Sequence, residues 1–301
     1  MLFGNYSFFC VLDNEAILPY YKGSTFRGVF GTALKRVVCA LRKQECKDCI
    51  LRQRCLYYQV FETPPSRPHP FVIEPPLTTD THFKEGSPFN FSLLLFGEAN
   101  KNLPYFVYAF EQMGRIGIGK RVKGKRGLFI VEKVESEDQL VYDGGKGNIT
   151  MKDPAELNLN HVSGKNQPGI TRLKLSIITP LRIKFQNRLI AELPFHVLVR
   201  AMLRRVSSLY SAYGQGEPDL DYKGLVHRAK AVRIAESDIG WFDWQRYSGR
   251  QDRAMLMGGI VGSITYEGEI GEYLPFLDFC ARAHLGKQTT FGLGMIRWEA
   301  I

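Results

Sequence analysis

The chain has 301 residues, of which 40 are Lys or Arg and 30 are Asp or Glu, so its net charge is +10. An apolar fraction of 45% is enough for a hydrophobic core and excludes a wholly disordered chain. The length predicts two domains, and the positive charge favours a polyanion such as nucleic acid as partner. The sequence shows neither an apolar run long enough to span a membrane nor a signal peptide, so we expect a cytoplasmic protein with no membrane partner.

The first half of the chain contains elements in the order β, α, β, β, α, β. In the first helix, apolar residues recur every three or four positions, Lys35 and Arg36 fall on the polar side, and Ser24 is placed to cap the first turn. This order is typical of the ferredoxin-like (RRM-like, βαββαβ) arrangement. The predicted elements are strand 6–12, helix 25–42, strands 71–74 and 89–96, helix 103–113 and strand 128–134.

The second half repeats this order after a polar linker at 144–147 and 158–169. We therefore predict an α+β fold of two tandem ferredoxin-like domains, 1–165 and 166–301, with a cysteine-rich metal knuckle inserted in the first. The predicted elements are a hairpin of 173–179 and 181–186, helix 193–213, strands 232–244 and 259–266, helix 273–284 and strand 293–298.

The inserted knuckle is predicted from four of the six cysteines, which lie within residues 39–55. Cys39, Cys46, Cys49 and Cys55 follow the pattern C-x6-C-x2-C-x5-C, and six cysteines in this length are too few for a disulfide scaffold. Four thiolates complete a tetrahedral site, so we expect structural zinc or, alternatively, an iron–sulfur cluster, and no catalytic metal. Free structural thiols are the other alternative.

Two glycine-containing segments are candidates for phosphate binding. Residues 119–127 read GKRVKGKRG and carry five positive side chains, which can follow an RNA backbone; a solvated hairpin tip is the alternative. Residues 286–294 read GKQTTFGLG and should offer backbone amides and Lys287 to a phosphate; a plain turn is the alternative. The second segment lacks the Walker pattern and the strand-to-helix position of a dinucleotide loop.

Three stretches together resemble a known family: HLGKQTTFGLG near the carboxyl end, GGIVGSITYEG upstream of it, and the basic helix GSTFRGVFGTALKR. With two ferredoxin-like halves, they are similar to the Cas-six family of CRISPR-associated precursor-RNA-processing endoribonucleases, in the RAMP superfamily. The similarity covers almost the whole chain and is most specific over 244–298. It implies a role in antiviral defence, with CRISPR repeat RNA or crRNA and other CRISPR effector subunits as partners.

The resemblance implies cleavage of repeat RNA without a catalytic metal. A 2′-hydroxyl attacks the adjacent phosphorus, which leaves a 2′,3′-cyclic phosphate and a 5′-hydroxyl. This reaction needs a base, an acid and a cation. Many relatives carry a histidine in or just after the first helix, but residues 25–55 contain none. We select His284, His227 and Tyr21 as catalytic candidates, and regard packing, solvated or loop positions as the alternatives for His69, His82, His161 and His196.

We therefore expect an endoribonuclease that binds RNA across a basic cleft between its domains. The alternatives are a non-catalytic RAMP subunit that holds crRNA in an effector complex and, from another class, an iron–sulfur regulatory protein. The residues predicted to bind RNA are Lys35, Arg36, Lys120, Arg121, Lys123, Lys125, Arg126, Arg204, Arg205, Gly286, Lys287, Gly292 and Gly294.

Overall fold

The structure is a computed structural model that describes residues 1–159, 169–186, 188–248 and 253–301, with the backbone alone over 245–248 and 253–256. The chain divides into two compact units, Leu2–Glu156 and Leu157–Ile301 together with Met1, here called the N-terminal and C-terminal units. The boundary between the two units, after Glu156, comes before the predicted boundary at 165. His161 and most of the predicted linker 158–169 lie outside the described residues. No described helix is both long and apolar enough to cross a membrane.

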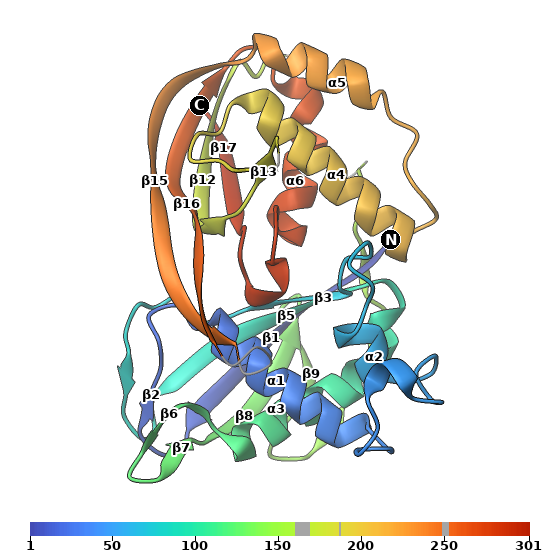
Figure 1. Ribbon diagram of the computed structural model, residues 1–301, viewed down its shortest axis with the longest axis vertical. Coiled ribbons are helices and arrows are strands. Elements are labelled where there is room, and N and C mark those ends of the chain that lie inside the picture. Colours follow the sequence, from blue (N-terminus) through green and yellow to red (C-terminus); the bar gives the residue numbers. More distant parts are fainter. Residues whose placement is uncertain (160–168, 187, 249–252) are drawn as a thin grey trace. The chain divides into compact units, whose positions relative to one another are not determined.

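The N-terminal unit combines an antiparallel sheet with two helices that pack against each other (Figure 1). The strand order is β10-β9-β8-β1-β5-β3, and β11 also pairs with β1. The predicted order β, α, β, β, α, β is confirmed by β1 (Leu2–Leu12), α1 (Gly23–Val38), β3 (Phe71–Glu74), β5 (Pro88–Phe96), α3 (Leu103–Ile116) and β8 (Phe129–Ser136). The sheet is extended by β9 (Gln139–Asp143), β10 (Asn148–Ile149) and β11 (Ala155–Glu156).

Aromatic rings from both helices and two central strands form the core of the N-terminal unit. Phe30 of α1 stacks on Phe110 of α3, with ring centroids 4.4 Å apart. Phe8 of β1 stacks on Phe91 of β5 at 4.8 Å and contacts Phe110 at 4.7 Å. All four side chains are buried, because helix periodicity and strand alternation bring them to one interior.

The first helix differs from its prediction at both ends. It ends at Val38, four residues before the predicted position, because Cys39 is extended (φ −84°, ψ 111°). Its N-cap is Lys22, which makes no side-chain cap hydrogen bond, so the prediction that Ser24 caps the helix is wrong. A short helix that the sequence analysis did not predict, α2 (Leu56–Phe61), follows the cysteine-rich segment. Phe61 of α2 contacts Phe30 at 5.5 Å, so α2 packs on α1.

The C-terminal unit has a four-stranded antiparallel sheet with the order β15-β16-β12-β17. Its main elements again follow the predicted order: β12 (Arg172–Leu181), α4 (Phe195–Tyr213), β15 (Arg233–Ser248), β16 (Arg253–Glu267), α6 (Leu274–Ala283) and β17 (Ile296–Ala300). Phe195 of α4 packs edge-on against Tyr266 and Tyr273, at 4.9 and 5.0 Å. The helix α5 (Tyr222–Arg228) was not predicted; Asp221 caps it by accepting a hydrogen bond from the Gly224 amide.

The predicted hairpin of 173–179 and 181–186 is wrong. A single strand, β12, continues through Pro180 to Leu181, because a register irregularity between Ile177 and Leu181 accommodates the proline within the pairing to β16. The hairpin in this region lies further on and consists of β13 (Lys184–Phe185) and β14 (Arg188–Leu189).

A separate small sheet in the N-terminal unit has the order β4-β2-β6-β7. It consists of β2 (Ala16–Ile17), β4 (His82–Phe83), β6 (Ile118–Val122) and β7 (Lys125–Gly127). Ile17 pairs with His82 on one side and with Lys120 on the other. Directly paired residues point to the same face, so His82, Ile17 and Lys120 form one row across the sheet.

Because Phe30 contacts both α3 and the sheet side of the core, Phe30→Ala should reduce the free energy of unfolding of the N-terminal unit by about 3–5 kcal/mol. Urea denaturation followed by circular dichroism would measure the change. Tyr105→Ala, at a position that is 53% exposed, is the control and should change stability by less than about 0.5 kcal/mol. Equal effects of the two substitutions would contradict this packing.

Candidate nucleic-acid interface

The glycine-rich segment 286–294 is a tightly folded connection between α6 and β17. Gly286, Gly292 and Gly294 all have positive φ, and a Cβ on Gly294 would lie 1.7 Å from the Leu285 carbonyl oxygen. The amide of Gly292 donates to the Thr289 carbonyl and that of Gly294 to the Pro180 carbonyl, at 2.8 and 3.2 Å. The glycines are therefore needed for backbone shape, and the prediction that their amides are free for a phosphate is wrong at these two positions.

Side chains beside this segment provide a strong positive charge. Lys287 is exposed, and its amide donates to the Arg182 carbonyl at 2.9 Å, which fixes it next to the end of β12. The pKa of Lys287 is lowered, first by partial burial and then by Lys184, Arg204 and Arg182. We call Arg182, Lys184, Arg204 and Lys287 the cationic cluster.

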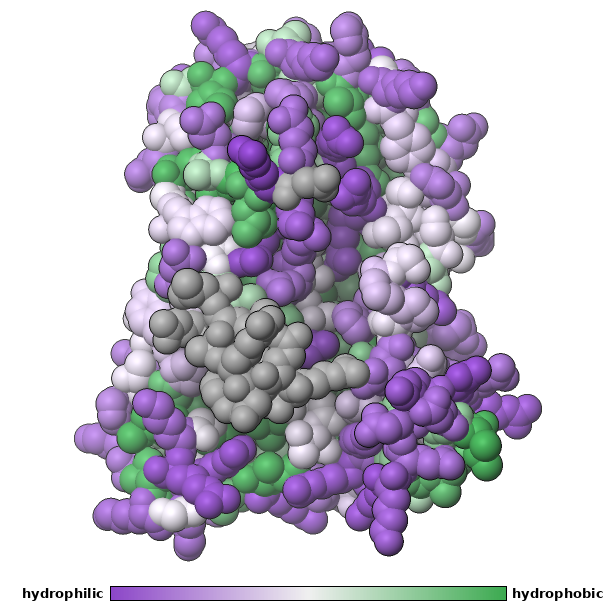
Figure 2. Space-filling model, viewed as in Figure 1, coloured by the Kyte–Doolittle hydropathy of each residue, from purple (hydrophilic) through white to green (hydrophobic). Residues whose placement is uncertain are grey.

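The cationic cluster has an acidic neighbour, Asp243, whose charge partly offsets the lowering of the Arg182 pKa by burial. None of its four side chains forms an ion pair with a described carboxylate within 4.0 Å. Arg182 donates from Nη1 to the Gly258 carbonyl, while its buried Nε has no hydrogen-bond partner in that same part. Four neighbouring cations, none of them ion-paired with a described carboxylate, favour a bound polyanion. Figure 2 shows that hydrophilic residues predominate on the face in view.

Arg204 and Arg205 are neighbours on α4 with opposite environments. Arg204 is exposed and belongs to the cationic cluster. Arg205 is buried, and its guanidinium donates to the main-chain carbonyls of His284 and Ala283 at 3.0 and 2.7 Å. Burial lowers the pKa of Arg205 to about 10, so it stays charged at neutral pH. The prediction that Arg205 contacts RNA is therefore wrong, because its charge is used to bind the end of α6.

His284 also has a structural position. Its side chain is 0% exposed, and its Nδ1 lies 3.0 Å from the Leu293 carbonyl oxygen. The residue directly follows α6, with φ +58° and ψ 152°. A fully buried imidazole bound to the main chain cannot approach a phosphodiester, so the prediction that His284 is catalytic is wrong.

The other predicted histidine, His227, is exposed on α5. The adjacent Arg228 forms ion pairs with Asp221 and Glu272, at 3.2 and 2.7 Å. These bonds hold α5 in place, while the imidazole of His227 remains accessible to solvent. His227 therefore stays a candidate for proton transfer.

In the N-terminal unit, Tyr21 directly precedes α1 and is half-buried. Burial, and then the charge of Glu74, raise the pKa of its phenol well above the ordinary value, so the phenol is protonated at neutral pH. The neighbouring Lys22 is fully buried and donates to the carbonyls of Tyr20 and Thr78, at 3.3 and 2.5 Å. Lys22 thus anchors the segment that precedes α1.

The basic segment 119–127 forms the hairpin β6–β7, with Lys123 and Gly124 at the turn in positive φ. A Cβ on Gly119 would lie 2.2 Å from the Ile17 carbonyl oxygen, which shows how closely β2 approaches. The five basic side chains are exposed and form no ion pair with any carboxylate of the described chain. They are Lys120, Arg121, Lys123, Lys125 and Arg126, and His82 lies in the same small sheet.

His82 lies on β4 of this small sheet, a placement that the sequence analysis did not predict. It is exposed, its Nδ1 lies 3.0 Å from the Thr81 hydroxyl, and its strand places it in the row with Lys120. By contrast, the Nδ1 of His69 is 2.8 Å from the Val60 carbonyl oxygen, and burial lowers the pKa of that imidazole. The row forms because β2 pairs with two segments that are far apart in the chain.

Of the two basic residues predicted on α1, Arg36 is exposed, whereas Lys35 faces the inserted segment. The Lys35 ammonium lies 5.3 Å from the centroid of the Tyr57 ring and hydrogen-bonds Cys46. In the structure Lys35 therefore contacts α2 and the cysteine-rich segment, while Arg36 remains available to a phosphate.

The cysteines of the inserted segment are partly exposed free thiols. Backbone hydrogen bonds from Cys49 to Cys46 and from Cys55 to Arg52 shape the segment into successive turns. Over the described residues, no three His, Cys, Asp or Glu side chains gather closely enough to hold a metal ion. The zinc or cluster site at Cys39, Cys46, Cys49 and Cys55 thus stays a prediction.

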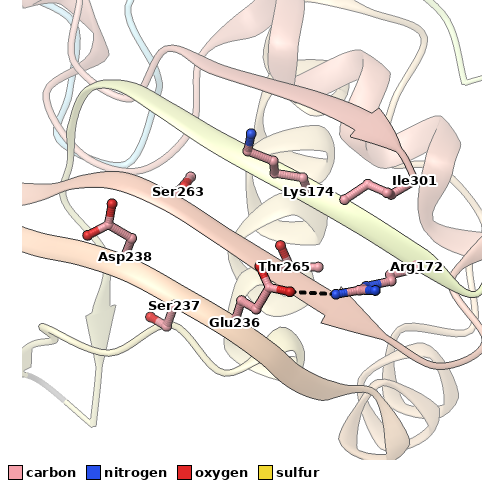
Figure 3. A pocket seen from close by; sticks show the side chains of 8 residues that line it. All are labelled: Arg172, Lys174, Glu236, Ser237, Asp238, Ser263, Thr265 and Ile301. Atoms are coloured by element: carbon pink, nitrogen blue, oxygen red, sulfur yellow. Dashed lines mark hydrogen bonds and ion pairs between the residues drawn. The ribbon is translucent and has the colours of Figure 1, made fainter.

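A pocket of about 450 Å³ lies on the sheet of the C-terminal unit (Figure 3). Arg172 donates to Glu236 across it at 2.6 Å, and Lys174, Asp238 and hydroxyl side chains complete much of the lining. The charges are balanced, and its eight lining residues include no aromatic ring on which a base could stack. The cationic cluster is therefore the better candidate for RNA within this unit.

Comparison with known proteins gives matches along most of the chain. A family model described as an N-terminal domain matches residues 1–154, and the model for the CRISPR-associated endoribonuclease Cas6 matches residues 175–296. An uncharacterized protein of Archaeoglobus fulgidus is 27% identical over 296 residues, which cover 93% of this chain and 92% of that protein. The cationic cluster falls inside the segment matched by the endoribonuclease model.

Solved structures with a similar fold include a Cas6 product complex, with a TM-score of 0.60, 13% identity and coverage of 99% of this chain and 100% of that one. Thermus thermophilus Cas6 gives a TM-score of 0.55 at 14% identity, covering 99% and 98%. A partial Cas6-RT-Cas1–Cas2 complex gives 0.61 at 12% identity, covering 100% of this chain and 46% of that chain. The mixed α/β fold with antiparallel sheets is thus that of Cas6 structures.

The contrast between adjacent arginines gives a test. Arg205→Ala should reduce the free energy of unfolding by about 2 kcal/mol or more, because two buried carbonyls lose their donor. Arg204→Ala should change stability by less than about 0.5 kcal/mol. It should also make the binding constant for RNA less dependent on salt concentration, by the amount expected for the loss of about one phosphate contact. Thermal melting and binding titrations at several salt concentrations measure the two effects. The assignment fails if the two variants exchange these phenotypes.

Proposed function

Because this chain belongs to the Cas6 family of CRISPR-associated proteins, we propose that it is an endoribonuclease that cuts precursor CRISPR RNA within the repeat. In the proposed reaction, a ribose 2′-oxygen attacks the adjacent phosphorus and the bond to the 5′-oxygen breaks. The products are a 2′,3′-cyclic phosphate and a 5′-hydroxyl, and the reaction proceeds without a catalytic metal. Repeat RNA, and other CRISPR subunits in the cytoplasm, are the proposed partners.

The observation that carries this proposal is the cationic cluster inside the segment 175–296. Its four side chains would bind the backbone phosphates, and their charge would stabilise the additional negative charge of the phosphorane transition state. Arg204 and Lys287 are exposed and reach the ligand directly, while Arg182 is held by the Gly258 carbonyl.

For proton transfer we propose Tyr21 as a donor, because its phenol lies next to the start of α1 and is protonated at neutral pH, so it can give a proton to the leaving oxygen. His82 is the proposed base in the N-terminal unit, where Lys120 in the same row supplies a positive charge. His227 is the corresponding candidate in the C-terminal unit.

We also infer that both units are ferredoxin-like domains. The four main strands are β1, β3, β5 and β8 in the N-terminal unit and β12, β15, β16 and β17 in the C-terminal unit. When the strands of each set are numbered 1 to 4 along the chain, both sheets have the strand order 4-1-3-2.

The central test is incubation of the purified protein with CRISPR repeat RNA in EDTA, followed by end-group analysis. We expect one cut that leaves a 2′,3′-cyclic phosphate, and at least a ten-fold slower cleavage for His82→Ala, with RNA binding retained, since general acid–base catalysis typically contributes about 100-fold or more. His227→Ala and Tyr21→Phe are compared in the same assay. Tight binding without any cut would instead identify a subunit that holds guide RNA.

For the inserted segment we propose structural zinc held by Cys39, Cys46, Cys49 and Cys55, since four thiolates are a donor set that suits zinc. The double variant Cys46→Ser and Cys49→Ser should release the metal and lower the melting temperature, because metal binding stabilises the folded segment. Elemental analysis and thermal melting measure both effects, with Cys10→Ser outside the segment as a control for metal content. A wild-type protein without zinc contradicts the proposal, and a brown protein that absorbs near 400 nm indicates an iron–sulfur cluster.

A further inference from the structure

A row of side chains on α4 leads from the cationic cluster to an aromatic ring. His196, Arg200 and Arg204 are four residues apart, so they lie along one side of the helix. His196 is half-buried, whereas Arg200 and Arg204 are exposed. The row thus changes from a cationic end at Arg204 to an imidazole end at His196.

The ring beside this row is Phe185 on β13. The guanidinium carbon of Arg200 lies 5.8 Å from the Phe185 ring centroid, and the His196 ring meets Phe185 edge-on, with centroids 6.1 Å apart and an interplanar angle of 78°. The residue before Phe185 is Lys184, a member of the cationic cluster. An aromatic contact and a phosphate-binding charge are thus adjacent in the sequence of one short strand.

The contact with Phe185 restricts the otherwise flexible Arg200 side chain. A planar guanidinium that rests on a ring by one face can offer its other face to a nucleobase, and guanidinium planes and aromatic rings are both surfaces on which unpaired bases stack. No described carboxylate lies within ion-pair distance of Arg200, so no acid competes for it.

The imidazole at the end of the row suits a base more than a phosphate. Partial burial, and then the charge of Lys230, lower the pKa of His196, so the ring is neutral at physiological pH. A neutral imidazole carries one donor and one acceptor, which can bond to the edge of a base. Arg204 and the other members of the cationic cluster are thus suited to bind phosphates, whereas His196, at the other end of the row, is suited to contact a base.

We propose that Phe185, His196 and Arg200 form a binding site for one unpaired nucleobase of an RNA strand whose phosphates occupy the cationic cluster. This proposal rests on the proposed function for the nature of the ligand. Such a site would let the protein distinguish one RNA sequence from another. The cationic cluster cannot do so, because phosphate contacts are independent of base identity.

The test uses a set of single-stranded oligoribonucleotides from the CRISPR repeat, each with one abasic position. With the wild-type protein, removal of one particular base should weaken binding by about ten-fold, the order expected for one stacked base. With Phe185→Ala, the intact RNA should bind about ten-fold more weakly, and the abasic substitution at that position should have no additional effect.

Two further variants separate the site from general charge. Arg200→Lys keeps the charge and the salt dependence of binding but should lose most of the effect of the missing base, since its ammonium is not planar. Tyr105→Ala, at an exposed aromatic residue of the N-terminal unit, should keep the wild-type response at every position. Circular dichroism is used to check that each variant is folded. If Phe185→Ala does not fold, Arg200→Lys alone tests the proposal.

The outcomes distinguish this proposal from the proposed function. If the wild-type protein cuts repeat RNA but shows the same small effect at every abasic position, the nucleobase site is wrong and the endoribonuclease stands. If one position is critical and stays equally critical in Phe185→Ala and Arg200→Lys, the base is bound elsewhere and the proposal is overturned. If the wild-type protein neither binds nor cuts the RNA, both proposals fail.

Discussion

The arrangement of the C-terminal unit depends on the buried guanidinium of Arg205, which binds the carbonyls of Ala283 and His284 where α6 ends. The last carbonyls of a helix have no partner within it, and a buried cation provides donors where the helix dipole is negative. This interaction fixes the point from which the glycine-rich segment begins. The segment carries Lys287, whose amide donates to the Arg182 carbonyl, so this part of the cationic cluster depends on the position of that segment.

The segment is then held at two further points. The Nδ1 of His284 contacts the Leu293 carbonyl, and the Thr179 hydroxyl donates to the Gly292 carbonyl at 2.7 Å while accepting from the Met295 amide at 2.9 Å. Because the amides of Lys287, Phe291, Gly292 and Gly294 donate to carbonyls of the chain, the segment offers the Lys287 side chain in place of these amides. The candidate anion site therefore consists mainly of side-chain charges, one of which this loop positions.

Like charges so placed oppose one another and lower the stability of the unit unless a polyanion is present. The same logic applies to the hairpin β6–β7, whose five basic side chains have no described acid within ion-pair distance. By contrast, the pocket on the sheet of the C-terminal unit pairs Arg172 with Glu236 and is electrostatically balanced. Unpaired charge, rather than the presence of a pocket, thus distinguishes the candidate RNA surfaces.

The sequence by itself determined the βαββαβ order of the main elements in each unit, because hydrophobic periodicity depends only on neighbours along the chain. It predicted β3 at its observed bounds and α3 at its observed start, and it located the basic hairpin and the glycine-rich segment. It could not distinguish Arg204 from Arg205, because both are basic residues of one helix and only packing against α6 buries the second. The positions of His284 and His82 were likewise decided by tertiary contacts, since burial and cross-strand pairing join residues that are remote in the sequence.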